Sequence, residues 1–177
     1  MPVEINESLK AAAGFIEIAV ITAPKGKGVD DIRTRSIFKG SKEHNDLVEK
    51  MKEYGQKKGL KLFLRDSNNV SESDAVVLIS VTAKPPLGIN CGMCGYDCNS
   101  IPRKKKINDY FAPICCFALV DLGIALGSAS KTAQILNIDN RIMYSIGATA
   151  LDMGLINGDV VIGIPLSVSS KNIYFDR

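Results

Sequence analysis

Apolar residues near the start of the chain recur at the three- and four-residue spacing of an amphipathic helix. The stretch 6–22 places Leu9, Ile16 and Val20 on one face, which is the side that a helix would bury. Pro24 and the glycines that follow it cannot continue a helix. The pattern therefore predicts a helix over residues 6–22 that packs against a core.

A second helical pattern begins at Ser41, which is a favourable N-cap residue, and runs to about Lys58. Its apolar stripe consists of Leu47, Val48, Met51 and Tyr54. Gly59 follows the last periodic residue and is typical of a helix C-terminus. His44 lies in the polar first turn, so we expect it to be an exposed helix residue.

Four stretches have the character of β-strands. Residues 32–38 alternate between apolar and charged side chains, and residues 60–64 could form a short strand. Residues 74–83 and 159–166 contain continuous β-branched runs, which are typical of strands buried on both faces. Together with the helices, these strands predict an α+β fold in which helices pack on a mixed sheet within a single domain, residues 1–177.

Two more helices are predicted, over residues 116–138 and 140–155. The first is rich in glycine and alanine, and glycine costs a helix about 1 kcal/mol relative to alanine. Such a helix is stable only if a neighbour packs closely against its backbone and offsets this cost. Gly123, Gly127 and Ala133 therefore indicate a tightly packed neighbour, which is either another helix or a planar cofactor.

The segment between the strand at 74–83 and the helix at 116 has a different composition. Prolines, glycines and a basic run predict a long irregular segment, and loops of this length in a compact domain are usually functional or disordered. It contains Cys91, Cys94 and Cys98, and the adjacent pair Cys115 and Cys116 ends it. We therefore assign residues 84–115 as a cysteine-rich, cluster-binding loop.

Three closely spaced cysteines with a remote fourth behind a proline are a familiar way to hold an iron–sulfur cluster. Gly92 and Gly95 would let the backbone between the thiols curl. Structural zinc sites usually gather two separate pairs of ligands, whereas three ligands from one short loop suit a cluster face. A cluster is favoured, with a zinc site and unligated buried cysteines as alternatives. Either Cys115 or Cys116 would be the fourth ligand.

The charge and hydropathy of the chain bear on nucleic-acid binding, membrane insertion and cellular compartment. The net charge is +3, and the basic run at 103–106 has no interleaved aromatic residues, so nucleic-acid binding is not expected. The simplest interpretation of that run is a solvated loop or a docking patch for an acidic partner. No uninterrupted apolar segment is long enough for a membrane span, and no secretory signal is seen. A cytoplasmic protein is expected, where cysteine clusters bind metal or do redox work.

The chain resembles the uncharacterised ferredoxin-domain proteins of anaerobic bacteria and archaea. The matching stretches are GINCGMCGY at 88–96, VDLGIALGSA at 120–129, DNRIMYS at 139–145, GIPLS at 163–167 and KNIYFDR at 171–177. The resemblance implies an iron–sulfur cluster, most simply of the 4Fe-4S type, with Cys91, Cys94, Cys98 and Cys115 as ligands. The family's fourth cysteine follows a Pro-x pair, which here matches Cys115, so Cys116 would be an extra.

The order of elements is also similar to the flavin-binding nitroreductase fold. That resemblance implies a nitroreductase-like domain, a homodimer with cofactor sites between two chains, and FMN as a candidate second cofactor. The arginine-rich start that grips the flavin phosphate is missing here. Residues 25–28 replace the usual polar loop after Ala23 and Pro24. This glycine loop could cradle a phosphate or be a solvated hinge.

Two functional hypotheses follow. In the first, the protein is an oxidoreductase whose cluster passes electrons to a flavin or another second cofactor. In the second, it is a non-enzymatic electron carrier or redox sensor that docks a redox partner protein through residues 103–106. A zinc-stabilised interaction module is a third alternative. The sequence contains no nucleophile–base pair that would support hydrolytic chemistry.

Overall fold

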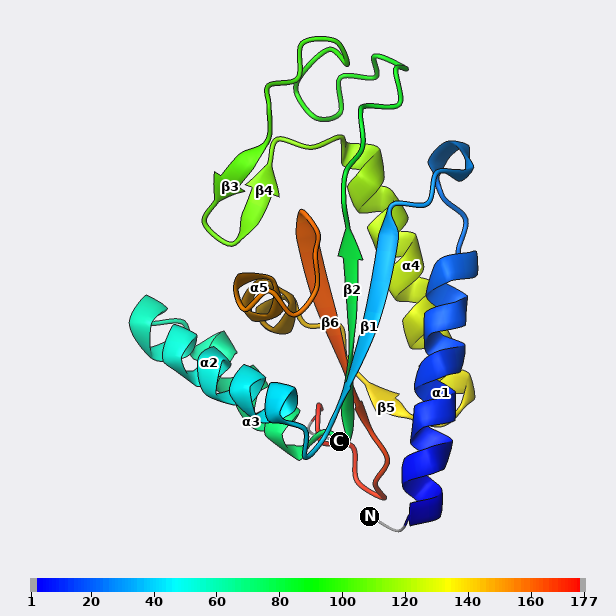
Figure 1. Ribbon diagram of the computed structural model, residues 1–177, viewed down its shortest axis with the longest axis vertical. Helices are drawn as coiled ribbons and strands as arrows, with labels where there is room; N and C mark the ends of the chain where they lie inside the picture. The colour runs from blue at the N-terminus through cyan, green and yellow to red at the C-terminus, as the bar shows by residue number, and fades with distance from the viewer. Residues whose placement is uncertain (1–2, 176–177) are drawn as a thin grey trace.

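The computed structural model describes residues 3–175 (Figure 1). The extreme ends of the predicted 1–177 domain, including the last two residues of the closing motif, lie outside the described residues. The elements are α1 (Val3–Thr22), η1 (Gly26–Gly28), β1 (Ile32–Phe38), α2 (Lys42–Lys58), α3 (Lys61–Glu72), β2 (Ala75–Val81), β3 (Lys105–Ile107), β4 (Tyr110–Ala112), α4 (Cys116–Ile135), β5 (Asp139–Asn140), α5 (Tyr144–Asp152) and β6 (Val160–Ser167).

The central sheet has the strand order β1-β2-β6-β5, and every neighbouring pair is antiparallel. β1 pairs with β2 from Ile32 opposite Val81 to Phe38 opposite Ala75. The α+β class is confirmed, but the prediction of a mixed sheet is wrong. The physical reason is the α2–α3 pair, which returns the chain to the end of the sheet where β1 finished, so β2 must run back along β1.

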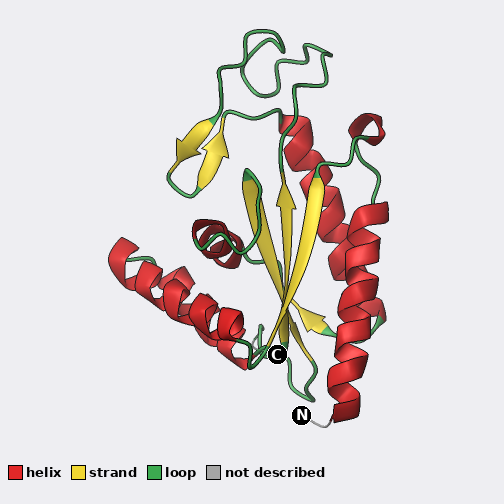
Figure 2. Ribbon diagram, viewed as in Figure 1, coloured by secondary structure: helices red, strands yellow, loops and turns green. Residues whose placement is uncertain are grey.

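β2 separates two apolar layers. Ala75, Val77 and Ile79 face α1 and α4, whereas Val76 and Leu78 face α2, α3 and α5. Figures 1 and 2 show these two helical layers on opposite sides of the sheet. All seven residues of β2 are buried, which confirms the prediction of a strand covered on both faces.

α2 begins and ends as its sequence predicts. The Ser41 Oγ atom accepts the His44 N–H at 3.2 Å, and Gly59 adopts the left-handed conformation (φ 64°) that closes the helix. His44, however, is buried with 2% exposure, so the prediction that it is exposed is wrong. Its Nε2 atom lies 3.0 Å from the Val70 carbonyl oxygen because α3 packs across this turn.

The short strand predicted over residues 60–64 is wrong, because α3 occupies this stretch. A short apolar run fits helical and strand periods equally well, and tertiary packing decides between them. In α3 the side chains of Phe63, Ser67 and Val70 are all buried, which is the spacing of one helix face. Phe63 is fully buried, so the helix gains a large aromatic contact with the core.

The last part of the chain matches the predicted order of elements with different bounds. α4 ends at Ile135 rather than at 138, and α5 covers 144–152 rather than 140–155. Between them lies the short strand β5, which pairs with β6. α5 packs very close to β6, since a Cβ atom on Gly147 would lie 1.8 Å from the Val161 carbonyl oxygen. β6 is close to its predicted range.

The glycines of α4 have no close neighbour within the described chain. Ala125, Ala129 and Ala133 are buried in the core, but Gly123 and Gly127 are exposed, and a Cβ on either would meet no atom within 4 Å. The tight packing that the small residues predicted is therefore provided within the chain by the alanines alone.

α4 is also the one helix among the described residues that is long and apolar enough to cross a membrane by length and composition. Core helices of soluble proteins can have the same length and apolar composition. α4 contains Asp121 and Lys131, and it packs Leu122 and Ala125 into the core beside α1. One side of α4 therefore belongs to the core, and its other side is exposed.

The burial of His44 predicts a pH-dependent stability. Burial lowers the pKa of His44 below its ordinary value of 6.5, although the hydrogen bond to Val70 partly opposes this. The folded chain therefore resists a proton that the unfolded chain accepts. The free energy of unfolding should fall as the pH drops through 6.5, by at most about 1.4 kcal/mol per pH unit, until the folded imidazole is also protonated.

This slope can be measured by urea denaturation between about pH 7.5 and about pH 5.5, where the side-chain carboxylates stay ionised. His44 is the only histidine in the sequence, so His44→Gln should flatten the slope. An equally steep slope in His44→Gln would contradict the assignment.

Candidate metal centre

The cysteine-rich segment leaves the end of β2 and projects beyond the sheet before it returns to α4 (Figure 1). Most of it is irregular, as predicted. The exception is a hairpin in which β3 and β4 pair from Lys105 opposite Ala112 to Ile107 opposite Tyr110. Strands of three residues carry too little periodicity to be predicted from sequence. The hairpin separates the three loop cysteines from the cysteine pair that begins α4.

Glycines set the path of the loop around its first two cysteines. Gly92 (φ 71°) and Gly95 (φ 85°) both adopt the left-handed conformation, which residues with a Cβ avoid. The Gly95 N–H donates to the Gly92 carbonyl oxygen at 2.9 Å and closes a turn. Cys91 therefore immediately precedes a tight turn and Cys94 lies within it, so the backbone curls between the two cysteines as predicted.

Asn90 ties the start of this loop to Cys98. Its side-chain oxygen accepts the Cys98 N–H at 2.9 Å, and its own N–H donates to the Cys98 sulfur at 3.4 Å. Asn90 itself has a positive φ of 48°, which asparagine tolerates better than most residues. These two bonds hold Cys98 beside Cys91. This role of Asn90 could not be recognised from the sequence alone.

The thiol at the start of α4 lies within electrostatic reach of the loop thiols. Burial raises the pKa of Cys116, and the negative charges of Cys94, Cys115 and Cys91 raise it further. Adjacent residues point in different directions at a helix start. Cys115 is the N-cap of α4 and lines a pocket, whereas Cys116 is the first residue of the helix.

The structure places these thiols in the same region of the molecule but does not gather them into a closed metal site. All five cysteines are free, and Cys91 is exposed. Within residues 3–175, no three His, Cys, Asp or Glu side chains are gathered closely enough to hold a metal ion. The donor set nevertheless suits an iron–sulfur cluster in number and kind, because soft thiolates on a short exposed loop are the ligands that such clusters use.

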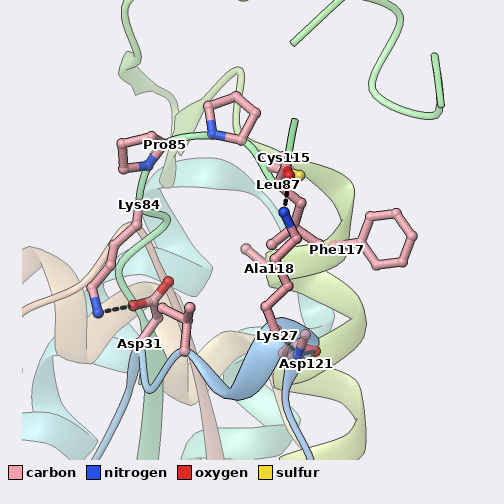
Figure 3. Close-up of a pocket in the computed structure, with 12 residues that line it drawn as sticks. Lys27, Asp31, Lys84, Pro85, Leu87, Cys115, Phe117, Ala118 and Asp121 are labelled. Atoms are coloured by element: carbon pink, nitrogen blue, oxygen red, sulfur yellow. Dashed lines mark hydrogen bonds and ion pairs between the residues drawn. The ribbon is translucent and has the colours of Figure 1, made fainter. Parts of the chain in front are cut away.

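A pocket of about 280 Å³ lies beside Cys115. Figure 3 shows Cys115 at one end of it and the Lys84–Asp31 ion pair (2.6 Å) at the other. Its remaining walls come from η1, from the Pro85–Leu87 stretch after β2, and from Phe117 and Ala118 at the start of α4. The lining is mainly apolar, so the pocket suits a small organic group next to a candidate cluster ligand.

Comparison with known sequences identifies the family. A profile described as "Uncharacterized protein containing a ferredoxin domain (DUF2148)" matches residues 111–177, which include Cys115 and Cys116. An uncharacterized protein from Archaeoglobus fulgidus is 41% identical over 174 residues, which cover 97% of this chain and 93% of the relative. The chain belongs to this ferredoxin-domain family. The resemblance predicted from the sequence is confirmed.

Solved structures place this ferredoxin-domain protein in the nitroreductase fold. An FMN-bound nitroreductase from Bacteroides fragilis has a TM-score of 0.61 at 12% identity, covering 100% of this chain and 82% of its own. A putative nitroreductase from Desulfovibrio desulfuricans in complex with FMN has a TM-score of 0.60 at 14% identity, covering 94% and 78%. The predicted nitroreductase-like architecture is therefore confirmed, and at such identities the likeness concerns the fold.

The glycine loop of this ferredoxin-domain protein does not fit a flavin phosphate. The Gly26 N–H donates to both carboxylate oxygens of Asp121, at 3.0 and 3.1 Å. The Lys25 ammonium donates to carbonyl oxygens at the end of α1, those of Val20 (3.1 Å), Ile21 (2.6 Å) and Ala23 (2.9 Å). The donors that a phosphate would use are thus occupied, and Asp121 would repel it. Sequence reasoning missed this role of Asp121.

Proposed function

We propose that this protein is a redox protein that holds an iron–sulfur cluster, of the 4Fe-4S type, on Cys91, Cys94, Cys98 and Cys115. The observation that carries the proposal is the glycine-turned loop, which presents three closely spaced thiols, with Cys91 and Cys94 near enough to act electrostatically on Cys116 at the start of α4. Membership of a ferredoxin-domain family supports it. Cys115 is chosen by the family resemblance, and Cys116 is the alternative fourth ligand.

When bound, a cluster supplies one-electron transfer. The chain's own residues would prepare the site for it. The N-terminus of α4, which Cys115 caps, would stabilise the negative charge of a bound cluster. The Asn90 N–H that already points at the Cys98 sulfur would stabilise that thiolate. Five free cysteines suit a reducing compartment, and we propose the cytoplasm.

Among the redox hypotheses, we favour an oxidoreductase that exchanges electrons with a small acceptor in the pocket beside Cys115. The pocket supports this choice because an organic group there would lie next to a candidate cluster ligand. The carrier hypothesis relies on the basic run at 103–106, and the structure ties half of it into the fold. Lys104 pairs with Asp159 at 2.5 Å, and Lys106 pairs with Asp152 at 3.0 Å.

The proposal is tested by purifying the protein without oxygen and measuring iron, acid-labile sulfide, zinc and flavin. We expect a brown protein with broad visible absorption and with iron and sulfide bound to the chain. Exposed clusters are lost by oxidation, so the sample is reconstituted with iron and sulfide before analysis. Stoichiometric zinc without sulfide in such a sample would show that the site is a structural zinc site.

We also propose a homodimer that forms over the outer face of α1 and α4. Phe15, Ile18 and Ile21 of α1 are each more than half exposed. Leu119 and Ile124 of α4 are about two-fifths exposed, beside the open surface at Gly123 and Gly127. Packing two copies together would remove these exposed apolar side chains from water.

Gly127→Leu is predicted to disrupt this dimer without unfolding the chain. The new side chain meets no atom of its own chain within 4 Å of its Cβ, but it would collide with a second copy packed on α4. Light scattering at micromolar concentration should show a dimer for the wild type and a monomer for Gly127→Leu. Lys61→Leu, which adds a similar side chain on α3, is the control and should remain dimeric. A monomeric wild type would remove the proposal.

A further inference from the structure

A hollow of about 540 Å³ lies on the side of the sheet that carries α2, α3 and α5. Its walls are the end of α2, the β3–β4 hairpin and α5, and Figure 1 shows the hairpin on this side of the sheet. The volume is within the range of sites that hold small organic molecules. None of the cysteines lines it, so it is separate from the proposed cluster site.

The two carboxylates of this hollow are already neutralised. Asp109 pairs with Lys58, and it also accepts the Tyr144 hydroxyl. Burial opposes ionisation of Asp109, but the bonds from Lys58 and Tyr144 outweigh it and lower its pKa. Asp152 pairs with Lys106 at 3.0 Å. Neither acid is left to repel an anion without a compensating cation beside it.

The cations of the hollow exceed its acids. Lys57, Lys58 and Lys106 line it together with Asp109 and Asp152, so one positive charge is uncompensated. The side chain of Lys57 makes no ion pair or hydrogen bond with any residue in the described part of the chain. Lys58 and Lys106 each retain ammonium N–H groups beyond those used by their acids.

A purely structural role explains only part of this arrangement. Lys57 and Lys58 complement the carbonyl end of α2, where basic residues are favourable. Lys106 comes from the hairpin, and its pair with Asp152 ties the hairpin to α5, but Lys57 has no such partner in the described part of the chain. The three lysines converge from two separate elements and outnumber the two acids, so the hollow has a net positive charge that favours an anion.

The hollow also has a fixed apolar side. The Tyr54 ring packs edge-on against Phe63, with centroids 6.0 Å apart, and this contact limits its movement. Leu60 lines the hollow and is 40% exposed, and Ala148 of α5 lies on its floor. An organic body could lie along this side while its charged group reaches the lysines.

We propose that this hollow binds a small organic phosphate, with the phosphate at Lys57, Lys58 and Lys106 and the organic body against Tyr54 and Leu60. Lysine ammonium groups act as point charges that suit a phosphate, whereas arginine, which is preferred for planar carboxylates, does not line the hollow. Three ammonium groups and the Asn108 amide can serve the several oxygens of a phosphate better than the two of a carboxylate.

The test uses isotope-labelled full-length protein and follows its amide NMR signals during titration at constant ionic strength. Inorganic phosphate should shift the signals of Lys57, Lys58 and Asn108 saturably. Phenyl phosphate should bind more tightly because its ring adds an apolar contact, and acetate should bind more weakly. Shifts that never saturate, or that spread evenly over surface lysines, would mean an adventitious ion only and would overturn the proposal.

Two variants locate the site. Lys57→Ala and Lys106→Gln should each weaken phenyl phosphate binding by about tenfold or more, since each removes a charged donor. Lys131→Ala, on the opposite side of the sheet, is the matched control and should bind as the wild type does. If Lys106→Gln disturbs the hairpin, Lys57→Ala decides alone, because its side chain has no partner within residues 3–175 to lose. Unchanged binding in Lys57→Ala would overturn the proposal.

Discussion

Cys91→Ala, Cys94→Ala and Cys98→Ala are each expected to remove the iron–sulfur cluster from the reconstituted protein. Each substitution deletes one thiolate, and no other cysteine lies on the loop to replace it. Iron and sulfide analysis, together with visible absorption, should fall to background. Thermal unfolding of the cluster-free variants should match that of the cluster-free wild type, because the loop contributes no residue to either core cluster.

Met93→Ala is the matched control for the loop. Met93 lies between two of the cysteines and is 58% exposed, so its removal changes the loop without removing a sulfur. It should retain the cluster. Cluster loss in Met93→Ala would show that loop conformation, and not ligation, explains the cysteine variants.

The cysteine pair at the start of α4 should respond asymmetrically. Adjacent side chains diverge at a helix start, so one cluster can easily take only one of them. Cys115→Ala is expected to lose the cluster and Cys116→Ala to retain it, in line with the family resemblance. The reverse result would make Cys116 the fourth ligand. Equal losses would show that the pair has been misinterpreted.

Gly147→Ala is expected to destabilise the fold more than any other single methyl addition in a helix. The added carbon would lie 1.8 Å from the Val161 carbonyl oxygen and 2.6 Å from the Ile162 Cα, both on the backbone of β6. Backbone atoms of an inner strand cannot move aside, so α5 would have to lift from the sheet. We expect the free energy of unfolding in urea to fall by about 3 kcal/mol or more.

Gly14→Ala is the control for this substitution. Gly14 lies within α1, and a Cβ there would meet no atom within 4 Å. Only helix propensity then changes, and the variant should gain about 0.5–1 kcal/mol. If Gly147→Ala gave a similar gain, the close packing of α5 on β6 would be wrong.

Local sequence signals predicted the elements that have a long apolar pattern or clear capping residues. The helix stripe at Leu9, Ile16 and Val20 is buried in one layer, and Ser41 and Gly59 bound α2 as their chemistry requires. The β-branched run of β2 is buried on both faces. In each case neighbours along the chain carry the information, through periodicity or a capping bond.

Only the part of the candidate site that lies within one short stretch of sequence could be predicted. The spacing of Cys91, Cys94 and Cys98 and the turn glycines could be recognised from sequence, and the family match is confirmed. The bond between Asn90 and Cys98 and the occupation of the Gly26 N–H by Asp121 could not. Both depend on groups that meet only after the loop and α4 are placed.

Tertiary structure alone decided several further features. The run around Phe63 became a helix, and His44 became buried, because α2 and α3 pack against each other. The sheet is antiparallel because that helix pair returns the chain to the end of the sheet where β1 finished. The three lysines of the anion-binding hollow come from segments about fifty residues apart, which share a surface only in the folded chain. Periodicity and capping report contacts along the chain, whereas these features depend on contacts between distant segments, which one sequence does not specify.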